Sequence, residues 1–236
     1  TEAPDPPVID NIESYSTEEL RQILMNHYKS STFNVCPHQK LPLMHGPELE
    51  LHVDPTVKPH VCHTPAPVPA HWEKQVKADL QRDVDLGVLE KVGPNVPVTW
   101  CARMILQRKH NGDPRRTIDF QPLNRACRRQ THHTAPPLQQ AQTVPHNTLK
   151  STNDMWNGYH SVKVREQDRH YLTFVTPWGR YRCITAPQGW VASGDGYTHR
   201  YDIITEEVEN KRRIVDDTLL YDNNIKEAFI HNAEYL

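Results

Sequence analysis

Two stretches within the first ninety residues place apolar side chains three or four positions apart, the spacing that gives a helix one apolar face. The first follows Ser16 and runs to about Lys29, and the pair Ser16 and Glu19 has the spacing of a capping box. The second ends at a glycine, and its periodic positions are Trp72, Val76, Leu80 and Val84, followed by Gly87. Both stretches are therefore predicted to be amphipathic helices.

Beyond residue 100 the pattern changes to short apolar runs separated by turn residues, which is typical of β-strands. Met104–Leu106 and Thr117–Phe120 flank the turn dipeptide Asn111-Gly112 and are predicted to pair as a hairpin. A second hairpin is predicted for 211–222, with Asp216 and Asp217 at its tip. The other predicted elements are strands at 160–164, 171–175 and 180–184, the last two joined by a turn at 176–179, and helices at 192–210 and 225–235.

The segment 36–70 is dominated by proline. It contains eight prolines, and only Leu49, Leu51 and Val53 alternate in the manner of a strand. Because proline has no backbone N–H to donate, a regular helix or central strand is disfavoured through most of this segment. It is predicted to be mainly an extended linker.

Composition narrows the class of protein. The chain has 236 residues, 36% of them hydrophobic, with a mean hydropathy of −0.74 and no run near the roughly 18 apolar residues of a membrane span. The first residues lack the basic start and apolar run of a secretory signal. The five cysteines are scattered without a C-x-x-C pair, which argues against a disulfide framework. A soluble protein of a reducing intracellular compartment is expected.

Three pairs of cysteine and histidine residues raise the question of zinc. None of them has the spacing of a zinc finger or the i, i+4 spacing of a helical site. No zinc site is therefore expected at these pairs, which are Cys36 with His38, Cys62 with His63, and His132 with His133.

The net charge of −2 conceals a local polarity. Residues 1–60 hold nine acidic and four basic side chains, whereas residues 103–129 hold eight basic and two acidic ones. A cationic stripe on a nearly neutral chain suggests a polyanionic partner. The alternative, a solvated charged face, stays open at this point.

Three aspartates form the candidate chemical site. Asp216 and Asp217 stand side by side between apolar residues, where like charges repel unless solvent or a cation stabilises them. Hard carboxylate oxygens suit Mg²⁺. Asp154 precedes a predicted strand and would join the pair if the two strands were neighbours, although each aspartate could equally be an ordinary turn or cap residue.

Five ordered motifs resemble the reverse transcriptase of gypsy-type LTR retrotransposons. The similarity covers roughly residues 40–236, and the motifs are 115–124, 154–159, 176–181, 186–189 and 215–217. The resemblance implies an α+β fold with the fingers and palm of a right-hand polymerase, an antiparallel palm sheet backed by helices, and no thumb. The implied segments are an N-terminal extension and linker at 1–46, fingers at 47–129 and 162–192, and palm at 130–161 and 193–236.

The resemblance also assigns roles to particular residues. Asp154, Asp216 and Asp217 match the catalytic aspartates that hold Mg²⁺, with Mn²⁺ as a substitute, and the first two are expected to be direct ligands. Tyr159 matches the aromatic gate that excludes a ribose 2′-hydroxyl. The remaining matched residues are expected to contact the nucleotide: Arg115 first, then Arg108 or Lys109 on the triphosphate, and Gln188 with Gly189 beside the base pair.

The function implied by this resemblance is RNA-directed DNA polymerase activity. The expected partners are an RNA or DNA template with its primer, deoxynucleoside triphosphates, and the protease, ribonuclease H and integrase of a polyprotein, in the cytoplasm or in virus-like particles. Tyr159 argues against an RNA-dependent RNA polymerase. The chain departs from the pattern in its polar segment 150–154 and in stopping 19 residues after Asp217. The alternative is a truncated, non-catalytic retroelement remnant that at most binds nucleic acid.

Overall fold

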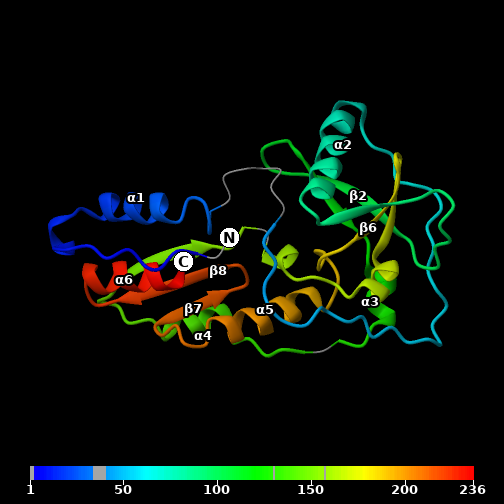
Figure 1. Ribbon diagram of the computed structural model, residues 1–236. Helices are drawn as coiled ribbons and strands as arrows, with labels where there is room; N and C mark the ends of the chain where they lie inside the picture. The colour runs from blue at the N-terminus through cyan, green and yellow to red at the C-terminus, as the bar shows by residue number, and fades with distance from the viewer. Residues whose placement is uncertain (1–2, 34–40, 130, 157) are drawn as a thin grey trace. The chain divides into compact units, whose positions relative to one another are not determined.

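The computed structural model describes residues 3–33, 41–129, 131–156 and 158–236 (Figure 1). The chain divides into two compact units, and each unit is assembled from segments that are not contiguous in sequence. Unit 1 comprises Thr1–Pro37, His133–Trp156 and Tyr201–Leu236, and unit 2 comprises His38–His132 and Asn157–Arg200.

Unit 2 is built on a five-stranded sheet with the order β1-β6-β5-β2-β3. All neighbouring strands are antiparallel except β2 and β5, which pair in parallel. Side chains from helix α2 and from the sheet share one apolar core, in which Val76, Leu80 and Phe174 are almost fully buried. The elements are α2 (Ala70–Asp85), β1 (Leu89–Val92), β2 (Ala102–Arg108), β3 (Pro114–Ile118), α3 (Gln121–Ala126), β5 (Thr173–Thr176) and β6 (Gly179–Cys183).

The proline-rich segment is not a free linker where the structure describes it. Leu51 is buried in the core of unit 2, and Leu49 forms a parallel bridge with Val164. A second bridge joins Val53 to Cys127. The strand-like alternation of Leu49, Leu51 and Val53 marks the part of the segment that forms these bridges and packs on the core, whereas the prediction of a linker missed that packing.

The predicted strand at 160–164 was also wrong. Gly158–Ser161 is a 3₁₀-helix, η2, and the buried residues Val162 and Val164 follow it without forming a ladder. The segment pairs only through single bridges, Val164 with Leu49 and Lys163 with Thr185. A second 3₁₀-helix, η3 (Glu166–Leu172), delays the start of β5 to Thr173.

Unit 1 contains a three-stranded antiparallel sheet with the order β4-β8-β7. Helix α6 packs on this sheet, and α1 packs in turn on α6, where the buried Tyr28 hydroxyl donates to the Ala233 carbonyl at 2.7 Å. The elements are η1 (Ile12–Ser14), α1 (Thr17–His27), α4 (Pro137–Gln142), β4 (Leu149–Asp154), β7 (Lys211–Ile214), β8 (Asp217–Asp222) and α6 (Ile225–Tyr235); helix α5 (Ser193–Ile204) contributes its last residues.

The predicted helices and hairpins form, except that the helix predicted at 192–210 ends at Ile204. The capping box forms, since the Ser16 hydroxyl accepts from the Glu19 amide and the Glu19 carboxylate accepts from the Ser16 amide at 2.8 Å. Gly87 follows α2 with φ +75°, a conformation that favours glycine. Within the described part of the chain, none of the helices has the length and apolar character required to traverse a bilayer.

Replacing Ser16 with alanine tests whether the capping box stabilises unit 1. We expect the free energy of unfolding to fall by about 1 kcal/mol, because the Glu19 amide loses its acceptor and the Glu19 carboxylate loses the Ser16 hydroxyl. Urea unfolding followed by far-ultraviolet circular dichroism measures the change. The exposed Met25 on the same helix provides the control, and M25A should change stability by less than about 0.5 kcal/mol. Equal effects of the two substitutions would contradict the assignment.

Candidate active site

The register of β4 and β8 brings two of the predicted aspartates together. Asp154 pairs with Asp217 across the antiparallel ladder. Residues directly opposite in such a ladder have Cα atoms about 4.5–5.5 Å apart and side chains on the same face. Asp154 is the last residue of a strand rather than a residue before one, which corrects the sequence prediction. The strand that carries Asp154 and the strand that carries Asp217 are therefore neighbours, as the predicted site requires.

Asp216 lies in the turn between β7 and β8. Ile214 pairs with Asp217, so Val215 and Asp216 alone form the turn, and Asp217 already belongs to β8. The backbone amide of Met155 donates to the Asp216 carbonyl at 3.0 Å, which ties the turn to the end of β4. The predicted tip of Asp216 and Asp217 is thus shifted by one residue, because the turn has only two residues.

Val215 adopts φ +59°, in the left-handed region. A β-branched side chain is rarely found there, because its Cβ substituents crowd the backbone. Such a conformation persists only when the surrounding structure holds it. The turn that carries Asp216 is therefore strained and depends on contacts outside itself.

Asp154 and Asp217 lie on the sheet face that α6 does not cover. Asn232 of α6 donates to the Ser151 hydroxyl at 2.8 Å and accepts from the Asn153 side chain at 3.3 Å. Because side chains alternate along β4, Asp154 points to the opposite face. The polar character of segment 150–154 has a structural role, since two of its side chains are hydrogen-bonded to α6.

Asp154, Asp216 and Asp217 are all exposed. Across residues 3–33, 41–129, 131–156 and 158–236, no group of three or more His, Cys, Asp or Glu side chains is arranged as a metal site. The donor chemistry of the three carboxylates suits Mg²⁺, but their side chains do not converge on one point in the structure. Of the cysteine and histidine pairs named above, Cys36 and His38 lie outside the described residues.

The predicted phosphate-binding residues lie in unit 2 at one end of the β2–β3 hairpin. Arg108 pairs with Pro114, and Arg115 pairs with Gln107 on the same hairpin. The connecting turn is closed by a bond from the Lys109 amide to the Asp113 carbonyl at 2.8 Å. Arg108, Lys109 and Arg115 are all exposed, so one end of the hairpin presents three cationic side chains to solvent. Because side chains alternate along a strand, this register directs Arg108 and Arg115 to opposite faces of the hairpin.

Tyr159 lies in η2, and its ring meets the Tyr197 ring edge to face at a centroid distance of 5.5 Å. Gly158 makes this packing possible, because a Cβ at that position would lie 2.9 Å from the Tyr197 ring. Tyr197 is fully buried, whereas Tyr159 is partly exposed. The predicted gate therefore rests on a ring that cannot easily move.

Gln188 and Gly189 form an exposed loop whose backbone is fixed by Asn124. The Asn124 side chain donates to the Gly189 carbonyl at 2.8 Å and accepts from the Val191 amide at 2.9 Å. Gly189 has φ +93°, which requires glycine. Asn124 has no role in the site predicted from the sequence, although its position at the end of the 115–124 motif was a signal that could have suggested one.

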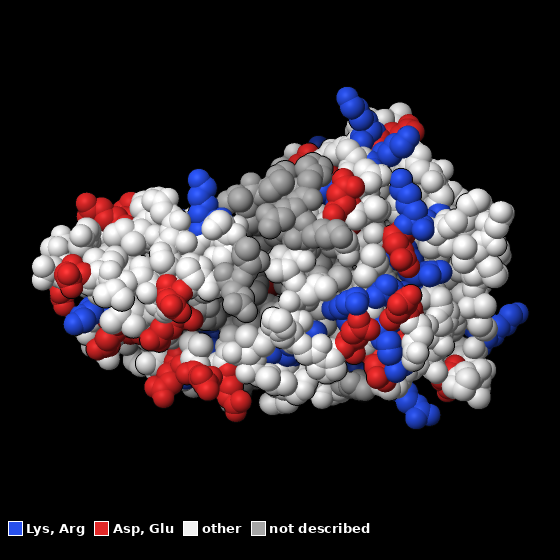
Figure 2. Space-filling model, in the orientation of Figure 1, with Lys and Arg blue, Asp and Glu red and all other residues white. Residues whose placement is uncertain are grey.

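Charge is distributed unevenly over the face drawn in Figure 2. Over α1 and α6 of unit 1, at the left, this face shows mainly acidic side chains, whereas basic side chains are frequent over unit 2. The excess of acidic residues in 1–60 and of basic residues in 103–129 is consistent with this difference. A polyanion would be attracted to the surface of unit 2 that carries the basic side chains.

No family model matches the chain. The Tf2-3 and Tf2-7 transposon polyproteins of Schizosaccharomyces pombe are each 20% identical to it over 172 residues, which is 72% of this chain. The chain spans only 13% of the length of these curated relatives.

Solved structures of a foamy viral protease-reverse transcriptase share the fold. The prototype foamy virus CSH mutant has a TM-score of 0.78 at 16% identity and covers 99% of this chain and 32% of its own. Complexes of the foamy viral protein with double-stranded DNA and with an RNA/DNA hybrid each give 0.80 at 14% identity over the whole of this chain, and 42% and 32% of theirs. Sequence and fold together point to the Pol region of a retroelement.

Removing one of the facing carboxylates should stabilise the protein in the absence of divalent cations. We expect D154N to raise the thermal midpoint by about 1–3 °C at low salt, because like charges opposite each other destabilise a strand pair. Differential scanning calorimetry in chelator-treated buffer measures this, and raised salt should reduce the gain. D10N, at an exposed aspartate near the N-terminus, is the control. A midpoint lower than wild type would show that the two carboxylates do not repel.

Proposed function

We propose that this chain is the nucleotide-adding part of a retroelement reverse transcriptase, an RNA-directed DNA polymerase. The observation that carries the proposal is the pairing of Asp154 with Asp217, with Asp216 in the adjoining turn. The similarity to Tf2 polyproteins and the fold shared with foamy viral protease-reverse transcriptases support it. The gypsy-type assignment and the division into fingers and palm belong to the same proposal.

In this proposal the three aspartates hold Mg²⁺, or Mn²⁺ as a substitute. Mg²⁺ prefers carboxylate oxygens combined with substrate phosphates, which suits an exposed set of carboxylates better than a closed protein cage. A pair of Mg²⁺ ions held there would supply Lewis-acid chemistry, which would activate the primer 3′-hydroxyl and stabilise the charge on the departing pyrophosphate. Asp154 and Asp216 would be the direct ligands, and the side chains would have to converge from their positions in the structure.

The exposed cations of the β2–β3 hairpin would bind the triphosphate of the incoming nucleotide. Arg115 is the principal candidate because a guanidinium offers a planar fork of donors to phosphate oxygens, and Arg108 and Lys109 add positive charge at the same end of the hairpin. Gln188 would donate to the nucleotide, and the backbone at Gly189 allows close approach. These roles concern unit 2, whose loops at Gly112 and Gly189 both have the positive φ that glycine tolerates.

Template and primer are the proposed macromolecular partners. Two of the structurally similar proteins were solved with double-stranded DNA and with an RNA/DNA hybrid. The basic residues of segment 103–129 would contact phosphates, so binding should weaken steeply with salt and show little sequence preference. Protease, ribonuclease H and integrase regions of the same polyprotein are further proposed partners.

A non-catalytic segment that only binds nucleic acid is the second candidate. The observation that favours it is that the carboxylates, within the described residues, are not gathered as a metal site. Both candidates share the cationic surface of unit 2, so binding of nucleic acid alone does not separate them. Addition of nucleotides to the primer end separates them, because only the polymerase candidate predicts it.

Primer extension on an RNA template separates the two candidates. With Mg²⁺ and deoxynucleotides the full chain should extend the primer, and D216N should reduce the rate at least about 100-fold because a ligand charge is lost while the turn remains polar. D10N should extend at the wild-type rate. If wild type and D216N give the same product yield as a blank, the polymerase proposal fails and the binding candidate stands.

Tyr159 provides a test of substrate choice. We expect Y159A to raise ribonucleotide incorporation relative to deoxynucleotide incorporation by about 10- to 100-fold, because a small side chain leaves room for the 2′-hydroxyl. Y159F should keep the discrimination of wild type, since the bulk of the ring and not its hydroxyl excludes the ribose. Single-nucleotide incorporation assays with matched dNTP and NTP pairs measure both ratios. Unchanged discrimination in Y159A would remove the gate from the proposal.

A further inference from the structure

We propose that Arg213 is a positioning residue that holds the turn carrying Asp216 in place. The inference rests on the proposed function for its catalytic meaning, but its structural basis lies wholly within unit 1. Arg213 is on β7, two residues before Val215, and its side chain is only 6% exposed. A buried guanidinium is costly unless its donors are paired, so its contacts indicate what it is for.

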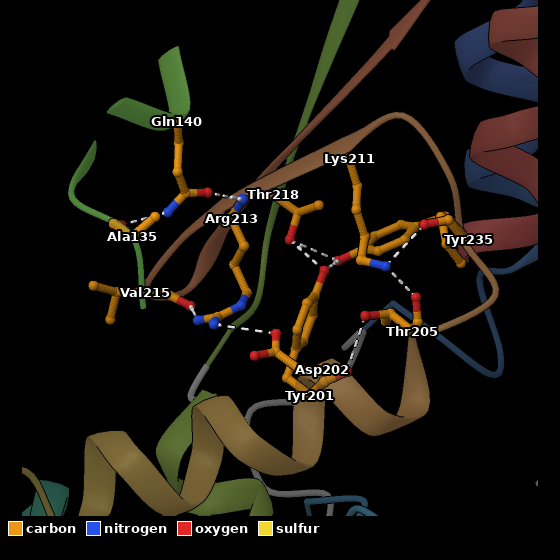
Figure 3. A network of polar contacts seen from close by, with 11 residues as sticks. Ala135, Gln140, Tyr201, Asp202, Thr205, Lys211, Arg213, Val215, Thr218 and Tyr235 are labelled. Atoms are coloured by element: carbon orange, nitrogen blue, oxygen red, sulfur yellow. Dashed lines mark hydrogen bonds and ion pairs between the residues drawn. The ribbon is translucent and has the colours of Figure 1, made fainter. Parts of the chain in front are cut away.

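The guanidinium of Arg213 makes two directed contacts at once. One terminal nitrogen, Nη1, donates to the Val215 carbonyl at 3.1 Å, and the other, Nη2, pairs with Asp202 of α5 at 3.2 Å (Figure 3). The Arg213 backbone amide also donates to the side chain of Gln140 at 3.1 Å. One side chain therefore links the turn to α5, while its own strand is bonded to α4.

The ring of Tyr201 restricts the movement of the Arg213 guanidinium further. The Arg213 group lies over the Tyr201 ring at 5.0 Å from the centroid. The Tyr201 hydroxyl is in turn hydrogen-bonded to Thr218 of β8 at 2.6 Å and to Tyr235 of α6 at 3.0 Å (Figure 3). The ring that supports Arg213 is thus fixed by the same sheet and helix that position the aspartates.

The bond to the Val215 carbonyl acts on the strained part of the turn. Val215 holds φ +59°, which its β-branched side chain disfavours. The peptide bond is planar. Fixing the Val215 carbonyl therefore also fixes the Asp216 amide and the position of the Asp216 Cα. Arg213 therefore compensates for the strain and fixes the position of the backbone that carries the Asp216 carboxylate.

Lysine cannot reproduce this arrangement. Its ammonium is a compact charge, whereas the guanidinium has donors on opposite sides that reach the carbonyl and the carboxylate together. R213K therefore keeps the positive charge near Asp202 but removes the second contact. Arg212, the preceding residue, supplies a matched control, because its side chain donates to Thr143 and to the Lys211 carbonyl and not to the turn.

Amide hydrogen exchange of the full chain tests the positioning role without any need for activity. The Met155 amide donates to the Asp216 carbonyl and reports the position of the turn. We expect R213K to accelerate exchange at Met155 about tenfold or more, and to leave the amides in the middle of β4 unchanged. R212K should leave Met155 within twofold of wild type. Unchanged exchange at Met155 in R213K, or an equal acceleration along all of β4, would overturn the inference.

Primer extension tests the effect of Arg213 on catalysis. R213K should lower kcat while the KM for the deoxynucleotide stays within twofold, because the residues proposed to bind the nucleotide lie in unit 2. A raised KM with unchanged kcat would contradict a positioning role. If the wild-type chain extends no primer, the proposed function fails, and exchange at Met155 still decides whether Arg213 holds the turn.

Discussion

Repulsion between carboxylates placed opposite each other on neighbouring strands is the constraint around which unit 1 is arranged. Asp154 and Asp217 face each other at the end of a ladder, with Asp216 one residue away. Like charges directly opposite each other lower the stability of the sheet. The packing of the rest of the unit therefore has to provide the free energy that keeps the sheet folded. The packing of α6 on the opposite face and of α1 on α6 does this, and it leaves the carboxylate face open to solvent.

The elements that could be predicted from the sequence are those whose signal is local. The capping box of α1, the four-residue periodicity of α2 and the Asn111-Gly112 turn each depend on neighbours within a few residues, and all three form. The failures have a different physical origin. Val162 and Val164 are buried in a segment that pairs only through single bridges, and the packing of Leu51 in a core was not predicted for a segment interpreted mainly as linker. Burial of this kind is determined by distant segments, which no local pattern encodes.

The candidate site divides in the same way. The identities of the aspartates, Tyr159 and Arg115 followed from motifs, because chemistry restricts which residue types can serve. The residues that hold these side chains in position could not be predicted from the motifs. Nothing in the sequence distinguishes the buried Arg213 from its partly exposed basic neighbours, and Asn124 and Asn232 look like ordinary polar residues. Each is recognisable only when the structure shows which backbone or side-chain groups it bonds, since a supporting residue is chosen for its reach rather than for its reactivity.

Register is what connects a widely shared fold to a particular chemistry. At 14–16% identity the foamy viral structures share the fold of this chain, and a fold alone does not define a function. The two-residue turn places Ile214 opposite Asp217, and the β4 pairing then places Asp217 opposite Asp154. A slip of one residue would turn Asp217 toward α6, where buried side chains such as Thr218 now lie, and would separate it from Asp154. The strained turn at Val215, with its buried arginine, therefore contributes to more than local geometry, because any relaxation that lengthened it would change the register on which the three carboxylates depend.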